Sequence, residues 1–137
     1  MKFLTLEDGQ FGVLCDGVVI DVVAAAQSLS VAAPATTLEA LVRTGDRAAE
    51  EVFRLAQQAL EKGFAGRPCD EVKPLAPLPV PRRNILCLGK NYLEHAQELA
   101  PKMKTSGDAP RHPIIFTKAT SSVIAPGEPI PAWQAYT

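Results

Sequence analysis

The sequence is poor in cysteine, in long apolar runs and in net charge, and each absence excludes a class of protein. Its three cysteines, Cys15, Cys69 and Cys87, lie far apart without a Cys-x-x-Cys pair, which is unlike a disulfide framework and typical of reduced cytosolic thiols. No stretch approaches the roughly 18 apolar residues of a membrane helix. The N-terminus turns acidic at Glu7, too early for the apolar core of a signal peptide. The net charge is −1 with both signs interspersed, so no basic stripe indicates nucleic acid. We therefore expect a cytoplasmic protein with no nucleic-acid or membrane partner.

The composition favours a folded, globular chain. Hydrophobic residues make up 47% of 137 residues, which is enough apolar surface for a core. This length suits one domain of ordinary size, or one small domain with part of another. The fold class we expect is α+β.

The first 23 residues predict a small antiparallel meander. Short β-like runs at Lys2–Glu7, Phe11–Cys15 and Val18–Val23 are separated by Asp8-Gly9 and Asp16-Gly17. Asp-Gly is among the strongest hairpin signals, so these aspartates are interpreted as turn formers rather than ligands.

A short helix is predicted near the start of residues 24–35. From position 38 to 60 the apolar residues then recur at helical spacing. The spacing is interrupted at residues 44–46, which predicts two helices with Asp46 capping the second. Thr36 and Glu39 stand three apart and predict a capping box at the start of the first.

A proline-rich connector is expected next, at residues 66–83. Its prolines are too frequent for a helix or a central strand, so an extended chain with a mostly solvated backbone is predicted. We place the domain boundaries accordingly: an N-terminal α+β domain at 1–65, a linker at 66–83, and a second domain beginning at 84 and running to 137, incomplete.

The chemistry is concentrated in the segment ILCLGKNYLEHAQE, residues 85–98. An apolar run that ends on a glycine predicts a buried strand. Asn91, with Glu94 three residues later, predicts the start of a helix, and Pro101 predicts its end.

His95 and Glu98 stand three residues apart on this predicted helix, which places them on one face. A carboxylate beside an imidazole orients the ring and raises its basicity, as a general base requires. The alternative is a solvated pair that contributes only a few tenths of a kcal/mol.

A second apolar strand is predicted at Ile114–Lys118, after a loop at residues 101–113 that could act as a lid. Lys118 at the strand exit could offer a fixed cation to a carboxylate or an enolate. Both predicted strands are apolar enough to be buried on both faces, so they need sheet neighbours and a covering layer.

Together these motifs resemble the fumarylacetoacetate hydrolase family. The resemblance lies in ILCLGKNYLEHAQE at 85–98, PIIFTK at 113–118 and SSVIAPGEPI at 121–130, in that order and at about the family's spacing. It implies a mixed β-roll core whose first strands and lid helix follow the N-terminal meander and helices. It also implies a homodimeric enzyme that binds Mg²⁺ (or Mn²⁺) and acts on β-diketo or 2-oxo acids.

The resemblance assigns roles to particular residues. His95, oriented by Glu98, would activate water in the cleavage of a carbon–carbon bond, as in acylpyruvate hydrolases or oxaloacetate decarboxylases; isomerisation also occurs in the family. Asn91, Tyr92 and Lys118 would contact the substrate.

The family's metal carboxylates would lie beyond this sequence, because Glu128 is the single acidic residue after Lys118. No metal ligand is therefore assigned to this chain, and we expect it to act with a missing C-terminal part. The alternative is a truncated, non-catalytic homologue that acts as an interaction or dimerisation module. A small binding domain unrelated to the family would be favoured if residues 91–99 formed a strand.

Overall fold

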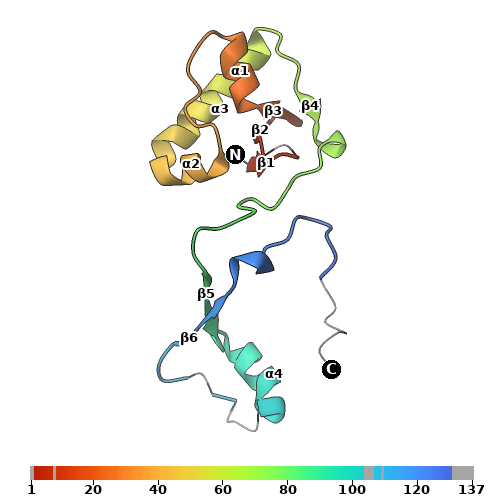
Figure 1. The fold of residues 1–137 in the computed structure, drawn as a ribbon. Coiled ribbons are helices and arrows are strands. Elements are labelled where there is room, and N and C mark those ends of the chain that lie inside the picture. The colour runs from red at the N-terminus through yellow and green to blue at the C-terminus, as the bar shows by residue number, and fades with distance from the viewer. Residues whose placement is uncertain (1, 8, 104–106, 109, 131–137) are drawn as a thin grey trace. The chain divides into compact units, whose positions relative to one another are not determined.

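The computed structural model describes residues 2–7, 9–103, 107–108 and 110–130. The chain is α+β and divides into two compact units, one of Met1–Pro79 with Val123–Thr137 and the other of Val80–Ser122 (Figure 1). We call them the N-terminal unit and the ribbon unit. Within the described ranges, no helix is both long enough and apolar enough to cross a membrane. The finer boundaries expected at 65/66 and 83/84 stay a prediction.

The N-terminal unit is built on a four-stranded antiparallel sheet in the order β1-β2-β3-β4. The strands are β1 (Lys2–Thr5), β2 (Phe11–Cys15), β3 (Val18–Asp21) and β4 (Arg67–Pro68). The predicted three-stranded meander is therefore confirmed. It ends earlier than expected, because the Asp21 side chain accepts a hydrogen bond from the Ala24 N–H (2.8 Å) and caps a helix instead of continuing the strand.

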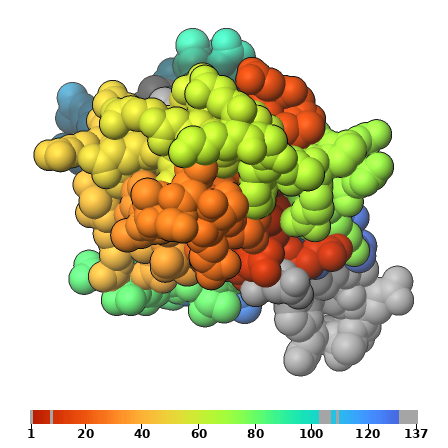
Figure 2. Space-filling view, turned by 90° about the horizontal axis from the view of Figure 1, so that it is seen from above, coloured from red at the N-terminus to blue at the C-terminus, as the bar shows by residue number. Residues whose placement is uncertain are grey.

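Helices α1 (Val22–Ser28), α2 (Leu38–Thr44) and α3 (Asp46–Glu61) follow the meander. Figure 2 looks onto α1 and α3, which pack against each other. Because strand side chains alternate, Phe11, Val13 and Cys15 share one face of β2, and all three are buried in a core that includes residues of α1 and α3. Burial raises the pKa of the Cys15 thiol, and the neighbouring Asp16 carboxylate raises it further.

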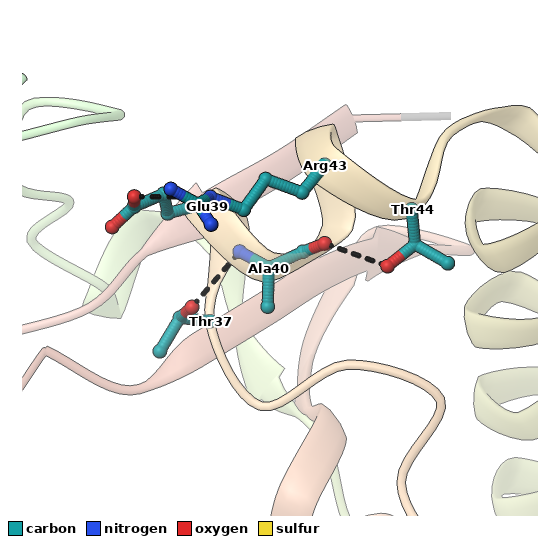
Figure 3. Close-up of polar contacts among 5 residues, drawn as sticks. All are labelled: Thr37, Glu39, Ala40, Arg43 and Thr44. Carbon is teal, nitrogen blue, oxygen red and sulfur yellow. Dashed lines mark hydrogen bonds and ion pairs between the residues drawn. The ribbon is translucent and has the colours of Figure 1, made fainter. Parts of the chain in front are cut away.

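The caps of α2 and α3 differ from the prediction by one residue each. Thr37, not Thr36, caps α2, since its hydroxyl accepts a hydrogen bond from the Ala40 N–H at 3.1 Å (Figure 3). At the next helix, the capping position is Gly45 (φ +86°), and Asp46 lies inside the first turn of α3. Adjacent threonines are chemically equivalent caps, so the tertiary path of the chain decides between them.

Most residues of the predicted connector are exposed, but part of it is attached to the sheet. Val72 and Ala76 are buried, the Leu75 N–H donates to the Thr5 carbonyl (2.8 Å), and the Thr5 hydroxyl donates to the Pro77 carbonyl (2.7 Å). Pro68 is accommodated because β4 is an edge strand, where a missing N–H costs no ladder bond. The segment from β4 to Pro77 is therefore bound to the sheet.

The ribbon unit contains two antiparallel strands, β5 (Ile85–Gly89) and β6 (Ile114–Lys118). Their positions match the prediction, but their burial does not. Every residue of β6 is exposed, and Leu86 and Leu88 of β5 are exposed as well. Two strands alone cannot cover both of their own faces, so burial would need further layers.

Helix α4 (Leu93–Met103) follows β5, so the reading as an unrelated domain with a strand at 91–99 is not favoured. The helix begins two residues after Asn91 and runs through Pro101, which was expected to end it. Proline in the last turn removes the hydrogen bond to the Gln97 carbonyl but keeps a helical φ, and the helix ends two residues later. Part of the loop predicted at 101–113 (104–106 and 109) lies outside the described residues.

A short 3₁₀ turn (Thr120–Ser122) and a Pro-Gly turn follow β6. The Glu128 N–H donates to the Ala125 carbonyl (3.2 Å), and the Glu128 carboxylate accepts from the Ala125 N–H (2.8 Å). Gly127 has φ +80°, which a type II turn requires at this position. Glu128 is thus used to close a turn.

Candidate functional site

The His95–Glu98 pair lies on an exposed face of α4. His95 is in the first turn of the helix, and its Nδ1 is 3.7 Å from Oε2 of Glu98. The two side chains are 49% and 71% exposed. The distance is too long for a hydrogen bond but lies within the range of an ion pair. The arrangement leaves Nε2 of His95 directed away from the Glu98 partner and available to another group.

Two contacts hold the helix that carries this pair. The Ala96 N–H donates to the Tyr92 carbonyl at 3.0 Å, which starts the helix, and the Ala96 side chain is fully buried. Gly107 lies against Gln97 and Ala100, where an added Cβ would be 3.3 Å from Cγ of Gln97. Gly107 therefore packs against α4 beside Gln97 and Ala100, and His95 is about half exposed.

Asn91 and Tyr92 lie in the turn between β5 and α4, next to the pair in sequence. Tyr92 is exposed, and Asn91 lines an open hollow of about 290 Å³ at this end of the ribbon. Their substrate-binding role stays a prediction.

Lys118 lies at the other end of the ribbon. It pairs with Ile85, whereas Gly89, which leads to α4, pairs with Ile114. Four residues of strand separate the two ends, about 13 Å at the usual rise per residue. Asn91, Tyr92, His95 and Glu98 lie within eight consecutive residues at the end of the ribbon that leads to α4, whereas Lys118 lies at the opposite end of β6.

Two cationic residues lie at the α4 end of the ribbon, and neither was assigned a role from the sequence. Lys90 and Arg111 line the same hollow as Asn91, although they are 21 positions apart in the chain. The pairing of β5 with β6 brings them together, which no local pattern reveals. In the structure Lys90 has φ +50°, an uncommon backbone conformation for a residue with a side chain.

The described part of the chain contains no group of three or more His, Cys, Asp or Glu side chains that could hold a metal ion. A magnesium site commonly needs more than one protein carboxylate around an octahedral ion. The residues present do not fit such an ion, so no step below is routed through a metal.

A family model described as fumarylacetoacetate (FAA) hydrolase, C-terminal, matches residues 84–136. This range contains β5, α4 and β6, and therefore every predicted site residue.

Similar proteins agree with this match. Oxaloacetate tautomerase YisK of Bacillus subtilis is 34% identical over 108 residues, which cover 76% of this chain and 34% of that protein. The human mitochondrial oxaloacetate tautomerase FAHD2B is 34% identical over 77 residues, 56% of this chain and 22% of that protein. The chain thus spans about a third or less of the length of these relatives.

A solved structure agrees as well. The crystal structure of a protein described as HpcE from Mycobacterium smegmatis matches with a TM-score of 0.58 and 26% identity, over 93% of this chain and 39% of that chain. The order of motifs, the family model and these relatives lead to one conclusion: the chain belongs to the fumarylacetoacetate hydrolase family.

Proposed function

We propose that this chain is part of an enzyme that acts on a 2-oxo acid of the oxaloacetate class, with His95 as the base that moves the proton. The observation that carries the proposal is the His95–Glu98 pair, exposed on α4 within the segment that the family model matches. The names of the relatives favour the interconversion of keto and enol forms over carbon–carbon cleavage.

The His95–Glu98 pair can carry out the proton transfer that this reaction needs. Nε2 of His95 takes a proton from the carbon next to the carbonyl, and the electron pair of that C–H bond becomes the C=C bond of the enolate. Glu98, 3.7 Å from Nδ1, stabilises the imidazolium that forms. The enolate oxygen then takes a proton, which gives the enol, and the reverse sequence restores the keto form.

Carbon–carbon cleavage would begin with the same groups. His95 would take its proton from water, and the hydroxide would attack a carbonyl carbon. Hydrolysis of an acylpyruvate and decarboxylation of oxaloacetate therefore remain reactions to be assayed beside tautomerisation. The non-catalytic interaction module is the less favoured alternative, because the relatives named above are tautomerases.

Other expectations from the sequence belong to this proposal. The small-molecule partner would be the oxo acid, and the protein partner would be a second copy or the part of the enzyme that lies beyond this chain. A divalent ion, Mg²⁺ or Mn²⁺, would be bound outside the described residues. The cytoplasmic location stays a prediction, and FAHD2B is mitochondrial by its name.

The experiment is an assay of all three reactions on the full-length protein. Oxaloacetate is added as the pure enol, and its conversion to the keto form is followed by the loss of enol absorbance; release of carbon dioxide and cleavage of an acylpyruvate are measured in parallel. We expect tautomerisation to be accelerated well above the buffer rate. A folded protein that accelerates none of the three reactions would overturn the proposal.

A further inference from the structure

The sheet of the N-terminal unit is covered differently on its two faces. The core on the helix side includes buried residues of α1, α2 and α3. Val19 of β3 stands between Val18 and Ile20, which both contact that core, so its own side chain is on the opposite face. There it forms a second buried cluster with Leu6 and Val72. Val72 comes from the connector, so this second face depends on the connector for its cover.

The second cluster lies close against the backbone of the central strand β2. A Cβ at Gly12 would be 3.0 Å from Cγ1 of Val19 and 3.2 Å from Cδ1 of Leu6. The absence of a side chain at Gly12 therefore lets both residues approach the sheet. Leu4 and Leu14 are partly buried beside them.

Residues 69–77, which we call the strap, cross this second face. They follow β4 at one edge of the sheet and reach β1 at the other. At β1 the Leu75 N–H donates to the Thr5 carbonyl (2.8 Å), and the Thr5 hydroxyl donates to the Pro77 carbonyl (2.7 Å). Val72 lies between the two edges in sequence and is 9% exposed in the cluster. The strap therefore closes the second face.

The attachment of the strap is slight compared with the helix-side core. Of its residues, all of which the structure describes, only Val72 and Ala76 are buried, and none belongs to a strand. The free energy of a local opening follows the apolar contacts and hydrogen bonds that it breaks. Opening of the strap breaks far fewer of these than separation of the helices from the sheet.

We infer that the strap is a conformational device of the N-terminal unit, which opens while the sheet and its helices stay folded. In the closed state, Val72 covers Leu6 and Val19. In the open state, these two residues face water together with Leu4 and Leu14. The inference does not depend on the proposed function, because it concerns contacts within the N-terminal unit alone.

The test is amide hydrogen exchange of the full-length protein at several low urea concentrations, followed by mass spectrometry with residue-level fragmentation. The Leu75 amide reports on the strap, and the Val13 amide, in the central strand, reports on global unfolding. Leu75 should exchange at least tenfold faster than Val13 relative to the unfolded chain. Its exchange should also depend less on urea, because opening exposes less surface than unfolding does.

Two matched valine truncations separate the strap from the core. Val52→Ala, in α3, destabilises the closed and the open state equally, so it should speed exchange at Val13 about tenfold and leave Leu75 within about twofold. Val72→Ala destabilises the closed state alone, so it should speed exchange at both amides about tenfold.

Equal protection of Leu75 and Val13 in the wild type would overturn the inference, because the strap would then open only when the whole unit unfolds. Val52→Ala that speeds exchange at Leu75 as much as at Val13 would do the same. An unprotected Leu75 amide would also overturn it, since the strap would not be closed. If Val52→Ala does not fold, the urea dependence in the wild type decides, and equal slopes at the two amides contradict the inference.

Discussion

The two units of this protein use apolar residues in opposite ways. In the N-terminal unit, side chains alternate between the two faces of each strand, and helices cover one face of the sheet. Phe11, Ile20 and Val52 lie in the core between them and have no exposed surface. In the ribbon unit, Leu86 is 73% and Ile115 is 65% exposed, although the strands are at least as apolar. Every residue with a proposed chemical role lies in the ribbon unit.

This difference separates stability from chemistry. The N-terminal unit has a core of its own, whereas the apolar strands of the ribbon unit lack, within this chain, the covering layers that would bury them. Residues that act on a substrate must stay accessible, and they are commonly placed on turns and short elements beside a stable scaffold. We therefore expect core substitutions to change folding and ribbon substitutions to change binding and catalysis.

The largest expected effect on stability is that of Phe11→Ala. Phe11 is fully buried and packs against Phe3, with ring centroids 5.9 Å apart, so its truncation should lower the free energy of unfolding by about 3–5 kcal/mol. Urea unfolding followed by circular dichroism measures this. Leu86→Ala, the matched change in the ribbon unit, should cost less than about 0.5 kcal/mol. Equal losses for the two variants would contradict the contrast between the units.

Gly66→Ala should have the next largest effect, and it tests the attachment of the connector to the sheet. A Cβ at this position would lie 2.7 Å from Cδ1 of Ile20 and 2.7 Å from Cγ2 of Val18, so the chain entering β4 would have to move. Overpacking of this kind costs about 1–3 kcal/mol. Gly63 is no suitable control because its φ is +86°, so Ala65→Gly serves instead and should change stability little. A neutral Gly66→Ala would show that the connector does not pack as described.

A smaller effect is expected at the start of α2. Thr37→Ala removes the cap of the Ala40 N–H and should cost about 1 kcal/mol, whereas Thr36→Ala should cost almost nothing. Thermal unfolding of the two variants measures the difference. A larger loss of stability in Thr36→Ala than in Thr37→Ala would instead support the capping box of Thr36 and Glu39 that the sequence predicts.

The smallest effect concerns pH. The pKa of Cys15 is raised in the folded state, so the unfolded chain releases this proton first as the pH rises through 9.0, and the contribution of Cys15 to stability is then lost. The free energy of unfolding should therefore fall more steeply above this pH in the wild type than in Cys15→Ala. Cys69→Ala, at an exposed cysteine, should keep the wild-type slope.

The sequence predicted those features that depend on short-range patterns. The bounds of β2 and β6 follow from apolar runs between turn residues, and the Pro-Gly turn follows from the φ that only glycine adopts freely. The facing of His95 and Glu98 follows from helical periodicity alone.

Features set by tertiary structure could not be predicted in the same way. The choice of Thr37 over Thr36 depends on the path of the chain into α2, and the burial of Val72 depends on a sheet that is distant in sequence. The hollow between Lys90 and Arg111 exists because β5 pairs with β6 in one register. The burial predicted for these two strands was wrong, because apolar character indicates a need for cover and cannot supply the covering layer.

The central claim is that the imidazole on α4 moves the proton, and the most direct test is kcat for oxaloacetate tautomerisation in the full-length His95→Gln variant. Removal of a general base should lower kcat by about 10²–10⁴-fold, while Glu94→Gln, on the same helix, should retain wild-type turnover. Turnover of His95→Gln within about twofold of the wild type would contradict the account.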